Sequence, residues 1–280
     1  MIENINWYPG HMKKTREIIS ENLKLVDVAV EVIDARIPVS SRNPVIDDIL
    51  KNKKRIVALC KSDLADDVEN EKWIKALEKT GAAAIPVNCV AGTGVPKFLK
   101  LLSKLQEEKN NGRARKKPLR LMIVGIPNVG KSSLINRLIG KKSAMTGDRP
   151  GITKGKQWLN LGDGIQLLDT PGILWPKFED RETGLHLAFC GSIKDEILDR
   201  ETLALELLAV LQEKCPALLV ERYKLDRLHD APLENMECIA LKRGFILPGK
   251  RIDYDRASRA LLDEFRSGAI GKITLEGGLW

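Results

Sequence analysis

The sequence predicts an α/β fold: a doubly wound, mostly parallel sheet followed by a C-terminal all-helical domain. Two observations support this prediction. Over the first 175 residues, short apolar segments rich in Val and Ile alternate with amphipathic segments of helical period, which is the pattern of a parallel sheet. After about residue 176 the helical segments continue, but the alternation with apolar strand-like segments stops.

The expected strands are mostly apolar, as is usual where helices cover both faces of a sheet. Strands are expected at 25–34, 55–60, 83–87, 119–124 and 165–168. Helices are expected at 11–24, 44–51, 69–80, 95–108, from 131 onward, and then at 201–214, 216–224, 232–243 and 255–267. Proline and glycine separate the last four helices. We therefore expect two domains, 1–176 and 177–280, with a polar, basic linker at 109–118 inside the first.

Composition and charge narrow the class of protein. No apolar run approaches the roughly 18 residues of a membrane span, and the first residues lack a secretory signal. Five cysteines without a C-x-x-C spacing fit reduced thiols in the cytoplasm better than disulfides or a zinc site. The formal net charge is +8, yet residues 176–280 hold 16 Lys/Arg and 19 Asp/Glu. The positive charge therefore belongs to the first domain, which is compatible with a nucleic-acid partner.

The most specific motif follows the fourth expected strand. Residues 125–132 read GIPNVGKS, which fits G-x-x-x-x-G-K-[ST]. Gly125 and Gly130 let backbone N–H groups approach phosphates, and the start of the next helix adds its positive end. Lys131 is expected to bridge the β- and γ-phosphates, and the Ser132 hydroxyl to bind Mg²⁺. The alternative is a chance match in a glycine-containing turn, which the strand–loop–helix context disfavours.

A second segment, Lys61-Ser62-Asp63, follows the strand at 55–60 and can read a base. The Asp63 carboxylate can accept hydrogen bonds from N1 and the exocyclic amino group of guanine, a donor pair that adenine lacks. The stem of Lys61 would lie over the base, and the backbone of 88–89 can offer N–H groups to the guanine carbonyl. Taken alone, K-S-D fits a solvated turn better. Its place at a strand end beside the other segments favours guanine.

Two more segments, 150–153 (PGIT) and 169–172 (DTPG), follow the phosphate loop. Asp169 is expected to hold Mg²⁺ through water, Thr153 to complete the Mg²⁺ shell, and the Gly172 N–H to touch the γ-phosphate. In an ordinary small GTPase the base-reading segment comes last, whereas here it comes first. A site survives such circular permutation because spatial neighbours can be reached in a different chain order. The expected GTP-binding residues are Cys60, Lys61, Ser62, Asp63, Asn88, Cys89, Asn128, Val129, Gly130, Lys131, Ser132, Ser133, Thr153 and Gly172.

His11 is a candidate for catalysis or gating. Permutation places the new N-terminus near the chain that follows 169–172, so His11 can reach the γ-phosphate side. Ile173 stands where many small GTPases have a glutamine that orients water, and an isoleucine cannot do so by hydrogen bonding. The alternative is that His11 packs beside Trp7. Reach is the first test of a candidate general base, so both readings stay open.

Taken together, the motifs resemble the circularly permuted ribosome-assembly GTPases of the YlqF/RbgA family. The matching segments are W-Y-P-G-H-M (7–12), D-A-R (34–36), K-S-D (61–63), G-I-P-N-V-G-K-S (125–132), P-G-I-T (150–153) and D-T-P-G (169–172). The resemblance implies GTP hydrolysis coupled to maturation of the large (50S) ribosomal subunit, with ribosomal RNA or precursor particles as partner. It also implies a K⁺ ion supported by Asn128. Cys60 departs from the family's Asn or Thr, and Asn88-Cys89 from its Ser-Ala.

Four cations in the linker, Arg113, Arg115, Lys116 and Lys117, are candidate RNA contacts, although a solvated linker has the same composition. Two other classes of protein stay open. One is a GTP-dependent binding switch that acts on another RNA or protein. The other is a metabolic kinase, which Lys61-Ser62-Asp63 argues against. We expect a monomer that needs Mg²⁺ and binds GTP and GDP.

Overall fold

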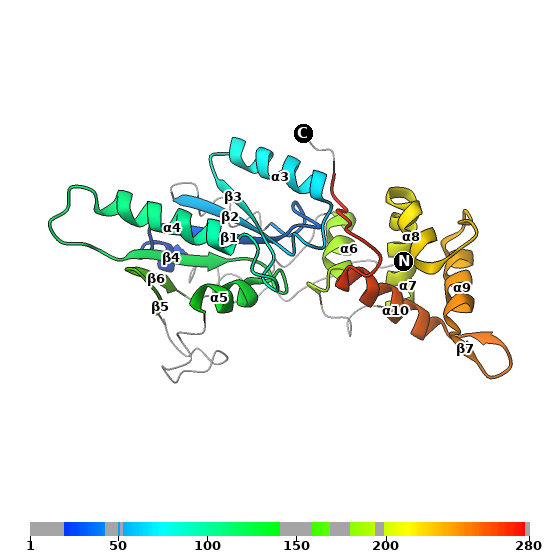
Figure 1. Ribbon diagram of the computed structural model, residues 1–280. Coiled ribbons are helices and arrows are strands. Elements are labelled where there is room, and N and C mark those ends of the chain that lie inside the picture. The colour runs from blue at the N-terminus through cyan, green and yellow to red at the C-terminus, as the bar shows by residue number, and fades with distance from the viewer. Residues whose placement is uncertain are drawn as a thin grey trace.

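The computed structural model describes residues 20–42, 50, 53–140, 158–168, 180–193 and 199–277. A six-stranded sheet with its covering helices forms one end of the molecule, and a group of helices forms the other (Figure 1). The strand order is β3-β2-β1-β4-β6-β5, and only β5 runs antiparallel to its neighbour. The strands are β1 (Val28–Asp34), β2 (Lys54–Cys60), β3 (Ala83–Val87), β4 (Leu119–Val124), β5 (Trp158–Gly162) and β6 (Ile165–Leu168).

Helices cover both faces of the sheet, as the mostly apolar strands predict. On one face, alternate residues of β1 and β4 pack against Phe98 of α4 (Val95–Asn110) and Leu134 of α5 (Lys131–Ile139). On the other face, residues of β2 such as Val57 pack against Trp73 of α3 (Asp67–Lys79). The helical residues 20–23 also lie on a second-face cluster, through Leu23. The alternation follows from the two-residue period of a strand.

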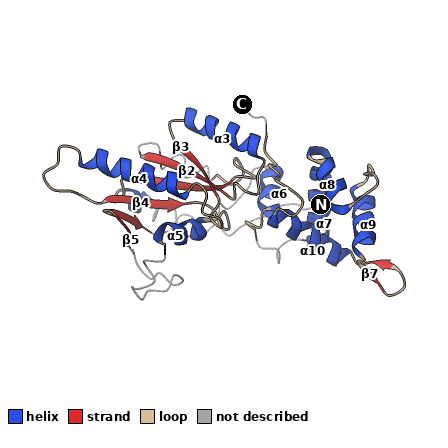
Figure 2. Cartoon of the chain, in the orientation of Figure 1, coloured by secondary structure: helices blue, strands red, loops and turns tan. Residues whose placement is uncertain are grey.

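The helical part begins with α6 (Arg181–Phe189), which lies between the sheet and the other helices (Figures 1 and 2). The remaining helices are α7 (Arg200–Lys214), α8 (Pro216–Tyr223), α9 (Pro232–Arg243) and α10 (Tyr254–Ser267). A short hairpin of β7 (Ile246–Leu247) and β8 (Arg251–Ile252) joins α9 to α10. Helix α7 packs against α9 and α10, and their apolar side chains join the same buried cluster as β1 and β4. Among the described helices, none has the length and apolarity to cross a membrane.

The structure corrects several expected elements. Strand β1 starts at Val28 rather than at residue 25, because 24–25 form a turn. Strand β5 was not expected: it is an edge strand with half-exposed side chains and therefore lacks an apolar run. Helix α6 was also missed. All its residues from Gly184 onward are buried, so it shows no amphipathic period. The expected helix 44–51 and most of 11–24 lie outside the described residues.

Candidate nucleotide site

The phosphate loop joins the end of β4 to the start of α5. Gly130 has φ 104° and Asn128 has φ 61°, so both lie in the left-handed region. Gly125 is required by packing, because a Cβ there would come within 2.6 Å of the Val32 carbonyl oxygen. The first turn of α5 has neither a side-chain cap among the described residues nor an acidic side chain. The start of α5 therefore has the polarity that favours binding of an anion.

The segments expected to read the base, 61–63 and 88–89, follow β2 and β3 at the same edge of the sheet as this loop. Strands β1, β2, β3 and β4 are parallel, so their carboxyl ends meet there. Cys60, at the end of β2, packs so closely on Gly130 that a Cβ on the glycine would lie 3.1 Å from Cys60 Cβ. The Cys60 Sγ also lies 3.9 Å from the Sγ of Cys89. Three segments far apart in sequence are thus in contact, as the sequence predicts.

Asp34, at the end of β1, binds Lys61 of segment 61–63, here named the base segment. Lys61 Nζ lies 2.9 Å from Asp34 Oδ2, and the guanidinium of Arg36 donates to both carboxylate oxygens at 3.0 and 2.8 Å. Burial alone would raise the pKa of the Asp34 carboxyl, but Arg36 and Lys61 outweigh it and lower that pKa to about 2. The D-A-R segment therefore fixes Lys61, a role that the motif did not reveal. Asp63 itself is exposed.

The segment that follows β3 is held by its own hydrogen bonds and by α5. Asn88 Oδ1 accepts from the N–H groups of Val90 and Ala91 at 2.8 and 2.9 Å. Arg137, on α5, donates to the Val90 carbonyl at 2.9 Å and packs against Gly92. Sequence reasoning missed Arg137, because its position in α5 carries no motif and its contact exists only in the folded chain.

Asn128 links the phosphate loop to the helical part. Its Nδ2 donates to the carbonyl of Gly191, just after α6, at 2.7 Å. With the amide nitrogen engaged, the side-chain oxygen is the atom left to approach a cation.

The other candidates fall into two groups. Lys131 is half-buried, and Ser132 and Ser133 are exposed in the first turn of α5. His11, Thr153, Asp169, Gly172 and Ile173 lie outside the described residues. Within the described ranges, no three His, Cys, Asp or Glu side chains are grouped as they would be in a protein-only metal site.

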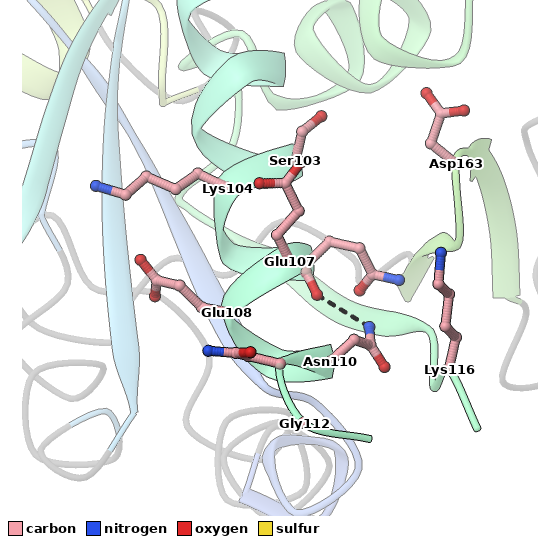
Figure 3. Close-up of a pocket in the computed structure, with 10 residues that line it drawn as sticks. Ser103, Lys104, Glu107, Glu108, Asn110, Gly112, Lys116 and Asp163 are labelled. Atoms are coloured by element: carbon pink, nitrogen blue, oxygen red, sulfur yellow. Dashed lines mark hydrogen bonds between the residues drawn. The ribbon is translucent and has the colours of Figure 1, made fainter. Parts of the chain in front are cut away.

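A separate hollow of about 800 Å³ lies at the C-terminal end of α4 (Figure 3). This end of the helix is the one away from the start of α5 (Figure 1). Its walls carry charges of both signs, including Lys104, Glu107, Lys116 and Asp163 (Figure 3). Arg113, Arg115, Lys116 and Lys117 are exposed in the loop beside it, which links α4 to β4. The structure therefore does not bring these four cations to the nucleotide site.

The fold and the phosphate loop define a P-loop GTPase whose base-reading segment precedes the phosphate loop, that is, a circularly permuted one. Residues 120–226 match the family model described as 50S ribosome-binding GTPase. The chain is 46% identical over 276 residues to ribosome biogenesis GTPase A of Bacillus cereus, covering 97% of this chain and 93% of that protein. It is 36% identical to mitochondrial ribosome-associated GTPase 1 of Mus musculus, covering 96% and 89%.

Solved structures agree with these relatives. The GDP-bound YlqF structure matches with a TM-score of 0.66 and 27% identity, covering 92% of this chain and 98% of that one. The GNP-bound form of YlqF from T. maritima matches with a TM-score of 0.64 and 28% identity, covering 94% and 97%. The chain belongs to the ribosome biogenesis GTPase A (YlqF/RbgA) family, and it is a GTP hydrolase.

Proposed function

We propose that this GTPase is an assembly factor for the large (50S) ribosomal subunit that binds ribosomal RNA or precursor particles. One observation carries the proposal. The phosphate loop and the base segments meet at one sheet edge, in a chain that matches relatives named for ribosome biogenesis over 97% of its length. A GTP-dependent binding switch for another RNA or protein is the alternative. A cytoplasmic monomer with domains 1–176 and 177–280 is part of the same proposal.

In the proposed site, the phosphates lie on residues 125–130 and the start of α5, with Lys131 between the β- and γ-phosphates. Asp63 reads guanine, and Lys61 is held over the base by Asp34. The N–H groups of Asn88, Val90 and Ala91 are already hydrogen-bonded within their loop. Among the described residues of that loop, the Cys89 N–H is therefore our candidate donor to the guanine carbonyl.

Hydrolysis is the attack of water on the γ-phosphate, in which the protein contributes positioning and electrostatics. Ser132, which is exposed, would hold Mg²⁺ together with Thr153 and Asp169, and the ion would supply positive charge to the phosphates. Asn128 would support a K⁺ ion through its amide oxygen. His11 would orient water or gate closure in place of the side chain that Ile173 cannot supply.

RNA binding is assigned to the loop between α4 and β4. Its cations, Arg113, Arg115, Lys116 and Lys117, are all exposed, and the loop projects beyond the end of the sheet (Figure 1). The excess positive charge of the first 175 residues supports this placement, because phosphate contacts supply most of the affinity for nucleic acid.

The proposed function is tested by sedimentation with ribosomal precursor particles in GDP and in a non-hydrolysable GTP analogue. We expect co-sedimentation that depends on the analogue, and its loss in Lys131→Ala, which removes the cation that faces the phosphates. Lys79→Ala removes an exposed lysine in the last turn of α3, outside the motif, and serves as the matched control. GTP hydrolysis without nucleotide-dependent binding to any particle would favour the alternative switch.

A further inference from the structure

The last described residues of the chain return to the sheet end of the molecule. After α10, residues 272–277, here named the C-terminal strap, run past α6 to α3 (Figure 1). The Ile273 N–H donates to the Leu64 carbonyl at 2.9 Å, and the Leu275 N–H to the Arg36 carbonyl at 2.8 Å. Ile273 and Leu275 are both buried. The strap is thus bonded through its backbone to the part of the chain that carries the base segment.

Side chains of the strap add to these bonds. The Asp66 N–H donates to Thr274 Oγ1 at 3.1 Å, and Lys272 Nζ lies 2.8 Å from a carboxylate oxygen of Asp67. Leu64, Asp66 and Asp67 follow Asp63 directly in sequence. The strap therefore holds the chain on the C-terminal side of the residue that we assign to guanine.

Glu276 anchors the end of the strap. Its carboxylate accepts from the Ser40 N–H at 3.0 Å and lies 3.0 Å from Nδ1 of His186 on α6. Its backbone carbonyl accepts from the Trp73 indole N–H at 2.9 Å. Glu276 is only 9% exposed, and a buried carboxylate with several partners has a fixed position.

The strap and the base segment also share one buried residue. Arg36 accepts from the strap through its carbonyl, and its guanidinium holds Asp34, which in turn holds Lys61. Arg36 is 1% exposed and also donates to the Arg266 carbonyl at the end of α10 at 3.4 Å. The chain on both sides of Asp63 is therefore held by contacts that lead to the strap.

We propose that the C-terminal strap is a positioning element for guanine recognition. It holds the backbone of 63–67 so that the Asp63 carboxylate faces the base. The helical part thereby sets nucleotide affinity through the base, which GTP and GDP have in common, and not through the γ-phosphate. The proposal rests on the assignment of Asp63 to guanine.

The test compares GDP with IDP, whose hypoxanthine lacks the exocyclic amino group that Asp63 would accept from. The strap variants are Thr274→Val, which removes the acceptor for the Asp66 N–H at nearly constant shape, and a chain that ends at Gly271. Thr80→Val is the matched control, because Thr80 Oγ1 makes a local hydrogen bond at the far end of α3. Affinities for GDP, GTP and IDP are measured by titration, with the melting temperature of each variant measured alongside.

We expect Thr274→Val to lower the affinity for GDP and the affinity for GTP by the same factor, about 5-fold. That factor corresponds to the free energy of one ordinary hydrogen bond. The affinity for IDP should fall less, so that the ratio of GDP affinity to IDP affinity becomes smaller. The shortened chain should show a larger decrease in this ratio, and Thr80→Val none. If the shortened chain does not fold, Thr274→Val alone decides.

Three results would overturn the proposal, and they are distinguishable. If the strap variants have a lower melting temperature but an unchanged GDP-to-IDP preference, the strap only stabilises the fold. A wild-type chain that binds GDP and IDP equally would remove the assignment of Asp63, and the strap's role in guanine recognition with it. A loss confined to GTP would also contradict the proposal, because it would place the effect at the γ-phosphate.

Discussion

Asp34 shows how one buried residue connects the nucleotide site to the rest of the chain. Its carboxylate is fully buried, which is tolerable only because the cations of Arg36 and Lys61 are bonded to it. Removing any one member leaves a buried charge with fewer partners. We therefore expect substitutions at these three positions to affect both stability and the placement of Lys61.

The Asp34 carboxylate should contribute stability that is lost only in acid. Its pKa of about 2 in the folded chain lies below the usual unfolded value of about 3.9. The contribution, roughly 2 kcal/mol, is thus fully present above about pH 5 and is lost as the pH falls toward 2. Urea unfolding should show a gap between wild type and Asp34→Asn that narrows from pH 6 to pH 3. A gap of constant size, or the same trend in the control Asp263→Asn on the surface of α10, would contradict this.

Cys89 should be the thiol that reports on the base. Its pKa is lowered by the hydrogen bond with Cys60, and the charge of Arg137 acts in the same direction. Burial raises the pKa of Cys190 to about 12 and that of Cys215 to about 11. Iodoacetamide at pH 7.5 should therefore label Cys89 before Cys190 and Cys215, and bound GDP should slow that labelling. Mass spectrometry of the peptides measures both, and equal labelling of Cys89 with and without GDP would place the base elsewhere.

At the scale of elements, the sequence predicts what is local. The strands at the core of the sheet are short, mostly apolar segments, and the phosphate loop is a contiguous motif, so both could be found from the sequence alone. Helix α6 could not, because burial on all sides leaves no period to detect. The role of Arg137 and that of the C-terminal strap could not either. They depend on contacts between residues far apart in sequence, which no local pattern encodes.

Asn128 joins the phosphate loop to the residues just after α6, and its side chain should make the rate of GTP hydrolysis depend on the monovalent cation. If its side-chain oxygen supports K⁺, turnover should be faster in KCl than in NaCl. Asn128→Ala should remove that difference, and it also removes the bond to Gly191. Asn160→Ala, on the edge strand β5, is the control and should keep the difference. The rates are measured by phosphate release. If wild type hydrolyses GTP at the same rate in both salts, K⁺ has no part in the mechanism.

At the scale of the whole molecule, charge is unevenly distributed. The part that binds the nucleotide is also the part with the excess of cations, and the helical part is slightly acidic. Because counterions are released when cations meet phosphates, the affinity for RNA should fall steeply with salt. The loop between α4 and β4 should account for much of that dependence.

Neutralising Arg113, Arg115, Lys116 and Lys117 together should weaken particle binding. It should also reduce the slope of log affinity against log salt by roughly 3, as expected if four phosphate contacts are lost. The matched control neutralises Lys75, Lys79, Lys97 and Lys100, exposed cations on α3 and α4. Particle binding is measured from 50 to 300 mM KCl. If both quadruple variants keep the wild-type slope, the loop is a solvated linker and does not contact RNA.

The strap also changes how the helical part can move. The chain enters that part through α6, where Gly191 is bonded to Asn128, and it returns through residues 272–277. A rigid body pinned at two places does not swing freely; it turns about the line that joins them. Displacements would then be smallest along that axis and larger at the β7–β8 hairpin, which lies at the end of the helical part away from the sheet (Figure 1). A change at the nucleotide would therefore reach that hairpin as a rotation with a defined direction.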